Sequence, residues 1–518
     1  MNLPPRARLP LLLAVACGAG ILQAFSIAWP WSGDPLWWLQ LLSLAVLAGL
    51  LQRQPSWRRG IFVGWAFATG WLVATFWWLF ISMHLYGGLA APLAAIAVVG
   101  LAAFLALYYA VGSAVFVRLQ GAGPLWDATL FASLWLGGEL LRATWFTGFP
   151  WGAGGYAHVD GPLAFLAAWV GVHGVGWLAA WIASLLASLA RRRADGKTAM
   201  AGVAVAAVVL LAGNAAIGLA APETAAPPLR VALLQGNIAQ DEKFEGGSGI
   251  PIALEWYGRA LQTADAHLVV APETSIPLLP QQLPQGYLEA LRAAFAEGPR
   301  AALVGVPLGS FAEGYTNSAI GMKPGDMEYR YDKHHLVPFG EFIPPLFKWF
   351  TRMMNIPLGD FDRGDVGQPS FDWRGERLAP NICYEDLFGE ELGARFRDPA
   401  TAPTIFVNLS NIAWFGDTVA IDQHLHISRM RALEFARPMI RATNTGATAI
   451  IDASGQVTQM LPPHTRGVLV GDVTGGRRIT PYAWWVARLQ LWPLWLLALG
   501  VPLLALVRAR RRKAPPYN

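Results

Sequence analysis

A short apolar-led run passes into a dense polar block in the stretch Arg377-Leu378-Ala379-Pro380-Asn381-Ile382-Cys383-Tyr384-Glu385-Asp386. A run of this kind predicts a β-strand, here from about Leu378 to Cys383. Cys383 is one of only two cysteines in the 518-residue chain. Its place at the end of a predicted strand, among polar neighbours, indicates a nucleophile, although a single cysteine is more often an inert packing residue.

The same pattern recurs on both sides of Cys383, within a polar block of about residues 223–478. Further strands are predicted at 229–234, 266–271, 301–306, 317–322, 404–408, 439–443 and 447–451. Helical stretches lie between several of them, at 251–264, 286–296 and 422–436. Strands that alternate with helices predict an α/β domain, in which polar groups just after strand ends usually build the site.

Two other ionisable residues suit a site with Cys383. Glu273 follows the predicted strand 266–271, and Lys333 lies in the run 331–341. A thiol with an ordinary pKa of about 8.5 needs a base or a positive neighbour to attack an acyl carbonyl, and Glu273 suits the base. An ammonium such as Lys333 stabilises the negative oxygen that then forms. The resulting thioester needs a second acceptor, either water or an amine.

Each of these residues also has a simpler interpretation. A glutamate after a strand is often a turn residue or a helix cap, and a lysine beside two histidines usually belongs to a solvated surface run. Three such motifs in one domain, in the order glutamate, lysine, cysteine, favour a catalytic set. Because no CxxC pair, HExxH spacing or glycine-rich phosphate loop occurs, we expect no metal and no cofactor.

The rest of the chain is too apolar for an ordinary soluble enzyme, since 54% of all residues are hydrophobic and 14% are charged. A bilayer core of about 30 Å needs about 20 apolar residues per helix. Eight spans are predicted, near residues 9–29, 35–52, 60–82, 88–117, 126–146, 162–190, 198–220 and 484–507. The predicted domains are a transmembrane part at 1–222, the α/β domain at 223–478, and a span with a basic tail at 479–518.

Positive charge flanks alternate ends of the spans, for example at Arg58 and Arg59 and in the tail 508–513, while the loops 30–34, 83–88 and 147–160 have no lysine or arginine. The positive-inside rule places both termini in the cytoplasm and the α/β domain in the periplasm. These anchors explain the net charge of +5, so we expect no nucleic-acid partner.

A signal peptide is the alternative interpretation of the first span, because Arg6 and Arg8 precede an apolar run. The run continues to Trp29, which is longer than a typical signal core, so a membrane helix is favoured. Cys17 is then a small apolar residue in the bilayer. Since it cannot easily reach Cys383, we expect Cys383 to be a free thiol.

The three motifs resemble those of the nitrilase, or carbon-nitrogen hydrolase, superfamily, whose members carry a Glu-Lys-Cys triad on a four-layer αββα sandwich. With its membrane spans, nearly the whole chain resembles one family within it, the apolipoprotein N-acyltransferases of the bacterial inner membrane. The most specific matches lie at 235–238, 271–274, 333–341, 383–385, 413–416 and 429–434, and in the membrane half at 146–151 and 155–156.

By position, the resemblance implies Glu273 as general base, Lys333 as oxyanion stabiliser and Cys383 as the nucleophile that carries the acyl group. Three more positions match residues important for activity in the family: Glu341, Tyr384 and Glu385. The resemblance implies that the first orients Lys333 or assists proton transfer. The other two would hold the thioester oxygen or the Lys333 head.

Two positions depart from the family pattern. Phe244 stands where the family often has tryptophan, which keeps an apolar contact for acyl chains. Ile412 replaces an aspartate, and Asp417 is the candidate to compensate for it.

Aromatic and other apolar residues near the triad predict contact with lipid. Four aromatic residues are expected to bind substrate: Phe244, Phe339, Trp414 and Phe415. The apolar run 342–354 is expected to form mobile arms that dip into the bilayer, with ordinary core packing as the alternative. Within the spans, Glu139 and Arg142 lie one helical turn apart and suit a pair, and His173 lies among glycines. Such groups are costly in a bilayer, although packing or an interfacial position explains them equally well.

The resemblance implies a two-step reaction at a membrane. A phospholipid donates its acyl chain to Cys383, and the N-terminal amine of a diacylated apolipoprotein accepts it. We expect membrane lipid and these two substrates as partners, and a monomer. Two alternatives use the same sequence features: a membrane-tethered nitrilase-type amidase with water as acceptor, and a transporter with an inert extracytoplasmic domain.

Overall fold

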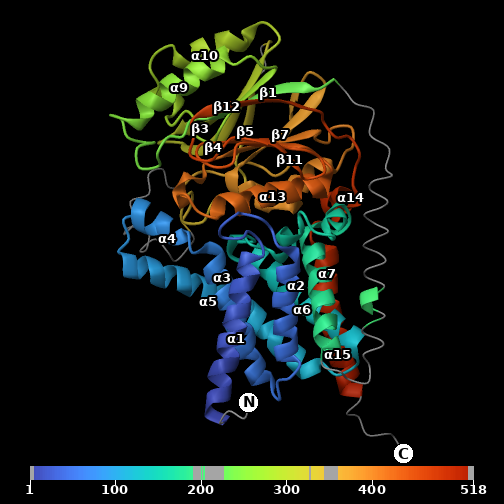
Figure 1. Ribbon diagram of the computed structural model, residues 1–518. Helices are drawn as coiled ribbons and strands as arrows, with labels where there is room; N and C mark the ends of the chain where they lie inside the picture. Colours follow the sequence, from blue (N-terminus) through green and yellow to red (C-terminus); the bar gives the residue numbers. More distant parts are fainter. Residues whose placement is uncertain are drawn as a thin grey trace, which may run out of the picture. The chain divides into compact units, whose positions relative to one another are not determined.

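The computed structural model describes residues 5–190, 200, 202–204, 227–325, 328–343 and 360–511. The chain divides into two compact units (Figure 1). A helical unit contains Met1–Trp77, Ala95–Ala220 and Leu489–Asn518, and an α/β unit contains Trp78–Ala94 and Ala221–Arg488. The second unit therefore combines the predicted α/β domain with a short segment from the apolar half of the sequence.

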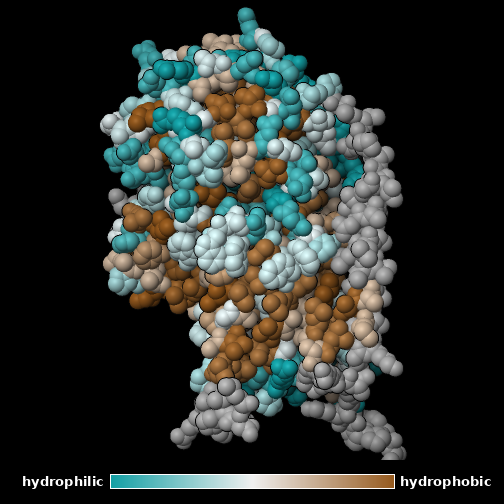
Figure 2. All heavy atoms as spheres, in the orientation of Figure 1, coloured by the Kyte–Doolittle hydropathy of each residue, from teal (hydrophilic) through white to brown (hydrophobic). Residues whose placement is uncertain are grey.

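The helical unit consists of α1 Pro5–Phe25, α2 Trp37–Leu51, α3 Trp57–Phe76, α5 Ala91–Leu119, α6 Pro124–Thr144, α7 Ala167–Leu189 and α15 Trp492–Arg511. By length and composition, four described segments could cross a membrane: Trp57–Phe76, Ala91–Leu119, Ala164–Leu189 and Trp492–Arg511. Apolar side chains gather over the visible face of these helices (Figure 2), as in a membrane protein. The predicted count of eight spans is not confirmed, and the span at 198–220 lies almost wholly outside the described residues.

The ionisable groups inside the helical unit have other hydrogen-bond partners than the prediction gave them. Glu139 accepts a hydrogen bond from the main-chain N–H of Gly154 at 2.9 Å and lies 3.4 Å from Nδ1 of His173. Arg142 donates to the main-chain oxygen of Phe149 at 2.8 Å. Within the described chain no ion pair joins Glu139 to Arg142, so the predicted pair is wrong. Both side chains instead fasten the loop that follows α6.

The C-terminal apolar stretch forms two helices, whereas one span was predicted at 484–507. The first, α14 Pro481–Leu489, is followed by Gln490 in the left-handed conformation, with φ +52°, and α15 begins at Trp492. The buried residues of α14 are Tyr482, Ala483, Val486 and Ala487. The compact α/β unit therefore extends to Arg488, past the predicted boundary at residue 479.

The α/β unit contains two six-stranded sheets. The first has the order β12 Gly467–Val473, β1 Leu229–Gln235, β2 Leu268–Ala271, β3 Ala301–Ser310, β4 Gly314–Met322, β5 Tyr329–Asp332. The second has the order β11 Val457–Met460, β10 Ala449–Ile451, β9 Met439–Thr443, β8 Ile405–Ser410, β7 Glu376–Ile382, β6 Phe371–Trp373. In each sheet the three central strands run parallel, β1–β2–β3 and β7–β8–β9. Their carboxyl ends are the edges at which α/β folds build sites.

The two sheets pack face to face with helices on both outer faces. Strand β1 shows why: alternate residues such as Leu233 belong to the core between the sheets, while Leu234 packs with α9 Gly249–Thr263 and α10 Tyr287–Ala296. Helix α13 Ala420–Phe435 lies against the second sheet (Figure 1). The unit is a four-layer αββα sandwich, as expected from the resemblance.

Four strands escaped the sequence analysis: β5, β6, β11 and β12. They lie at the outer positions of the sheets, and three are short, with 3 or 4 residues. β12 has seven residues, but its apolar run 468–470 is only three residues long, and Val468 and Val470 are exposed. Strands covered on one side only lack the buried runs that identified the central strands.

The segment after α3 leaves the helical unit earlier than predicted. α3 ends at Phe76, and the short helices α4 Leu79–Ile81 and η1 Ser82–Tyr86 follow, the latter a π-helical turn. They belong to the α/β unit. The predicted span 60–82 therefore ends about six residues early.

Candidate active site

Cys383 is the first residue after β7 and opens the 3₁₀ turn η6 Cys383–Leu387. Its φ of +52° is in the left-handed region, which is strained for a residue with a Cβ. Two side chains hold the turn: His424 and the amide of Asn408 contact the Cys383 main-chain oxygen at 3.3 and 3.4 Å. Strain of this kind at a strand end is a frequent mark of a catalytic residue.

Glu273, Lys333 and Glu341 form a buried charged cluster. Nζ of Lys333 donates to Oε1 of Glu273 at 3.2 Å and to Oε1 of Glu341 at 2.9 Å. Lys333 has 0% of its surface exposed. Glu273 follows β2 and Lys333 follows β5, two strands of one sheet that have β3 and β4 between them. Glu341 contacts Lys333 directly, so its orienting role stays a prediction.

Asn317 organises this cluster and was missed by the sequence analysis. Its Nδ2 donates to Oε1 of both Glu273 and Glu341, each at 2.7 Å. Its main-chain oxygen accepts from the N–H of Lys333 at 2.8 Å. The residue lies on β4, where only the strand was predicted. One amide in a strand carries no sequence signal by itself, because its partners come from distant segments.

The second sheet supplies a donor that faces both the carboxylate and the sulfur. The main-chain N–H of Asn411, just after β8, donates to Oε2 of Glu273 at 2.9 Å. The Asn411 N–H and the Ser410 side chain also act on the Cys383 sulfur, where each tends to lower the pKa of the thiol. Glu273 is therefore held between the two sheets, adjacent to the candidate nucleophile.

The protonation states favour a neutral thiol beside an ionised glutamate. Burial, reinforced by the charge of Glu273 and opposed by Lys333, raises the pKa of Cys383 to about 12. Burial also tends to raise the pKa of Glu273, but Lys333 and Lys243 outweigh it, and the pKa is lowered. Burial opposes the charge of Lys333, yet Glu273 and Glu341 raise its pKa above the ordinary value. The resting arrangement suits a base that removes the thiol proton during attack.

Glu385 holds the backbone rather than the Lys333 head. Its Oε1 accepts from the main-chain N–H of His334 at 2.7 Å, and its Oε2 accepts from Ile382 N–H at 2.6 Å and the Tyr331 hydroxyl at 2.7 Å. These bonds tie the segment after Lys333 to the end of β7. The expected contact with the lysine head is thus replaced by a scaffold role.

The ring of Tyr384 packs beside those of His335 and Phe388, with centroids at 5.6 and 5.3 Å. Tyr384 has 4% of its surface exposed. It belongs to the aromatic packing that supports the turn.

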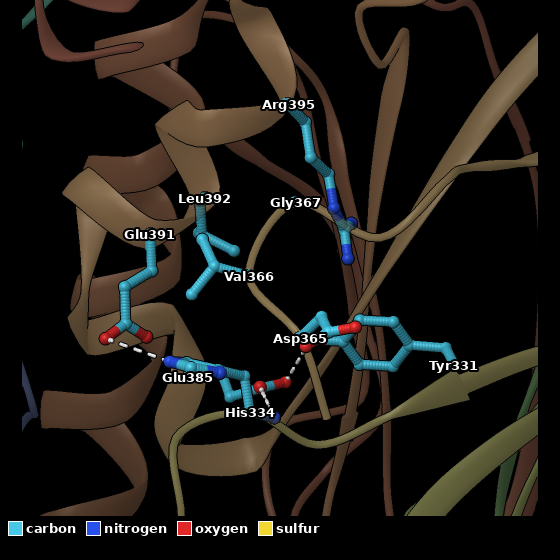
Figure 3. Close-up of a pocket in the computed structure, with 9 residues that line it drawn as sticks. All are labelled: Tyr331, His334, Asp365, Val366, Gly367, Glu385, Glu391, Leu392 and Arg395. Carbon is cyan, nitrogen blue, oxygen red and sulfur yellow. Dashed lines mark hydrogen bonds and ion pairs between the residues drawn. The ribbon is translucent and has the colours of Figure 1, made fainter. Parts of the chain in front are cut away.

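A small polar pocket lies beside the Glu385 carboxylate. Figure 3 shows its lining residues, with Glu391 directed toward His334, whose Nε2 is 3.9 Å from Oε1 of Glu391. Arg395 lies over the Tyr331 ring at 5.0 Å. None of Glu273, Lys333 and Cys383 lines this pocket, so it supports the scaffold and is separate from the candidate catalytic groups.

Comparison with known proteins places this geometry in a family. Residues 19–185 match the apolipoprotein N-acyltransferase N-terminal domain, and residues 230–480 match the carbon-nitrogen hydrolase family. An apolipoprotein N-acyltransferase of Verminephrobacter eiseniae is 61% identical and covers 91% of each chain. One of Ralstonia nicotianae is 46% identical over 98% of this chain and 95% of its own. This chain belongs to the apolipoprotein N-acyltransferase family. Membership argues against the transporter alternative.

The aromatic residues expected to contact lipid in this family member are half-buried. Phe415 packs on Trp78, with ring centroids 4.2 Å apart, and Trp414 meets Tyr86 edge to face at 5.9 Å. Trp78 also donates to Oε1 of Gln423 at 3.1 Å. The segment after α3 thus holds the two aromatic residues that follow Asn411.

The other two residues expected to contact lipid, Phe244 and Phe339, come from other segments of the α/β unit. Phe244 lies beside Lys243, with the ammonium 5.8 Å from its ring. Phe339 has φ +64° and closes a tight turn with Phe342. Most of the run 342–354, where the mobile arms were predicted, lies outside the described residues.

Ile412, the departure from the family pattern, is a buried apolar residue. It has 2% of its surface exposed and faces Gly446 closely. Asp417 does not take over the role of an aspartate there, because its side chain is 88% exposed and lies 3.7 Å from Nε2 of His464. Glu273 is held by Asn411 and Asn317 without such an aspartate.

A second buried polar cluster, the Asp386 cluster, lies beneath the Cys383 turn. Asp386 accepts hydrogen bonds from Ser428 at 2.5 Å and lies 3.0 Å from Nε2 of His424 and 3.4 Å from Nη1 of Arg441. All four side chains have at most 1% of their surface exposed. Asp386 is the last residue of the polar run 381–386, and helix α13 was predicted. Only the fold brings the two together.

Proposed function

We propose that this protein transfers an acyl chain from a membrane phospholipid, through a thioester on Cys383, to the N-terminal amine of a diacylglyceryl-cysteine apolipoprotein. The proposal is carried by family membership over both halves of the chain, together with a strained cysteine beside a buried glutamate and lysine. A ping-pong acyl transfer needs these three groups and no cofactor.

In the first half-reaction the Cys383 sulfur attacks the ester carbonyl of the phospholipid. Glu273 takes the thiol proton as the carbon–sulfur bond forms. Lys333 donates to the oxyanion of the tetrahedral intermediate. The ester carbon–oxygen bond then breaks, and Glu273 returns the proton to the leaving lysophospholipid oxygen.

In the second half-reaction the amine of the apolipoprotein attacks the thioester. A carbon–nitrogen bond forms, the carbon–sulfur bond breaks, and the amine proton passes through Glu273 to the sulfur. The same base and cation therefore serve both halves, with the direction of proton transfer reversed at the sulfur.

Both substrates are amphiphiles, which explains the apolar helices. Extracting an acyl chain from lipid costs about 0.8 kcal/mol per CH₂, so a site served from the membrane avoids most of this cost. We place the protein in the bacterial inner membrane, with both termini cytoplasmic and the α/β unit periplasmic, from the distribution of positive charge in the sequence. Periplasmic labelling of single surface cysteines tests this orientation.

Supply of a radiolabelled phospholipid and a diacylated lipopeptide to the full-length protein in detergent tests the reaction. The label is expected on the peptide amine, and mass spectrometry is expected to find an acyl thioester on Cys383 that Cys383→Ala abolishes. Release of free fatty acid with an unlabelled peptide would favour the amidase alternative, and absence of any covalent intermediate would contradict the proposal.

A further inference from the structure

A second lysine, outside the expected triad, reaches the main chain of Glu273. Lys243 lies in the turn between β1 and α9 and has 2% of its surface exposed. Its Nζ donates to the main-chain oxygen of Glu273 at 3.1 Å and lies near the ring of Phe244. Among the described residues this is its only hydrogen bond, so two of its three N–H groups have no protein acceptor there.

Hydrogen bonds fix the position of the loop that carries Lys243. Its loop is fastened to the ends of β8 and β9: Nδ2 of Asn411 donates to Gln240 Oε1 at 2.9 Å, and Nδ2 of Asn444 donates to the Ile238 main-chain oxygen at 2.8 Å. The same Asn411 holds Glu273 by its main-chain N–H. The elements that position Glu273 therefore also position Lys243.

The balance of charge gives Lys243 a task. The hydrogen-bond partners of the Glu273 and Glu341 carboxylates are all N–H groups, which is the arrangement expected of ionised carboxylates. Two carboxylates and the Lys333 ammonium leave one net negative charge beside Cys383, where acyl transfer adds another. Lys243 brings the resting site to neutrality. Lys333 already shares its N–H groups with two carboxylates, whereas those of Lys243 are largely unused.

We propose that Lys243 is a second active-site cation, which neutralises the excess carboxylate and so favours build-up of negative charge at Cys383 during acyl transfer. This inference rests on the proposed function. The charged groups that act on it are Glu273 and Cys383, and burial lowers its pKa to about 8. Its charge is therefore present at neutral pH and lost in mildly alkaline solution.

Three variants separate charge from hydrogen bonding. Lys243→Met removes both, Lys243→Gln keeps a donor for the Glu273 oxygen, and Lys243→Arg keeps the charge. We expect thioester formation in a single turnover at pH 7 to fall about 10²-fold in the Met and Gln variants, with partial recovery in Arg. The wild-type rate should fall as pH rises past about 8, and this alkaline fall should be absent in Lys243→Met.

Alkylation of Cys383 by iodoacetamide, followed by peptide mass spectrometry, gives a readout that needs no lipid substrate. Alkylation at pH 7 should be several-fold slower in Lys243→Met and Lys243→Gln than in the wild type. Lys323→Met is the matched control, because Lys323 also donates to a main-chain oxygen and lies near a phenylalanine ring; it should change neither rate.

Wild-type rates of thioester formation and of Cys383 alkylation in Lys243→Gln would show that only the hydrogen bond matters and would overturn the proposal. Wild-type rates in a folded Lys243→Met protein would also overturn it. If wild-type protein transfers no acyl chain, the proposed function fails, while the alkylation result still decides the charge role of Lys243.

Discussion

Two buried polar clusters flank the Cys383 turn, and they differ in how completely they are satisfied. In the Asp386 cluster, one carboxylate receives the donors of His424, Ser428 and Arg441, and the groups are closed on one another. In the cluster around Glu273, two carboxylates share one lysine and one amide, and the cluster faces a reactive thiol.

This difference indicates that the Asp386 cluster supports the structure, whereas the cluster around Glu273 takes part in the chemistry. A closed cluster stabilises one conformation because every buried charge has a partner. A cluster in which lysines hold a glutamate ionised beside a buried thiol keeps a base ionised and a nucleophile protonated, which is costly for stability but useful for proton transfer. Variants in the two clusters should therefore fail in different assays.

Glu273→Gln should have the largest effect. Loss of the base should slow acyl transfer about 10³-fold, equivalent to about 4 kcal/mol of activation free energy. Alkylation of Cys383 by iodoacetamide should become faster, because the charge of Glu273 contributes to the raised pKa of the thiol. Single-turnover acylation and alkylation rates, measured on one preparation, check both.

A loss of both activities in Glu273→Gln, with altered thermal unfolding, would mean that Glu273 mainly supports structure. The opposed changes in the two rates are specific to a base that is also a negative neighbour of the sulfur.

Asp386→Asn should damage stability more than chemistry. It leaves the buried Arg441 and His424 without a carboxylate, which should cost about 3 kcal/mol in the free energy of unfolding. Denaturant unfolding of the purified protein measures this. The pH dependence of Cys383 alkylation in the folded variant should match that of the wild type, and a shifted dependence would place Asp386 in the chemical cluster.

This contrast also shows how much of the site could be predicted from the sequence. Glu273 and Cys383 could be found because each lies at or next to a predicted strand end, where local patterns are strong. Lys333 could be found from the run 331–341, although its strand β5 was missed. Asn317 and Lys243 could not, since their importance comes from contacts with Glu273, which lies 44 and 30 positions away from them. The central strands were predicted from buried apolar runs, and the outer strands were missed because they are short or partly exposed.

The membrane half was predicted at the level of apolar segments, but not at their ends. The segment 78–94 reads as the end of one span and the start of another, yet it belongs to the α/β unit. Hydropathy reports the transfer of a segment into an apolar environment and does not distinguish lipid from the aromatic side chains of a folded domain.

The raised pKa of Cys383 predicts a distinctive pH dependence in the wild-type protein. Alkylation requires the thiolate, so its rate should keep rising from pH 8 to 10, without levelling off near the ordinary value of 9.0. Because the folded pKa lies above the unfolded one, the folded protein should also lose stability as pH rises above about 9. A plateau in the alkylation rate below pH 9 would contradict the burial and charge argument.

Trp78→Phe should have the smallest effect and tests the link between the two clusters. The change removes the hydrogen bond to Gln423 while keeping a ring against Phe415, so it should cost about 1 kcal/mol of unfolding free energy. Gln423 precedes His424 of the Asp386 cluster, and Phe415 follows Asn411, which holds Glu273. If Trp78 only fills space, acylation and alkylation rates should stay at wild-type values, whereas a slower acylation at unchanged alkylation would mean that this segment positions Glu273 through Asn411.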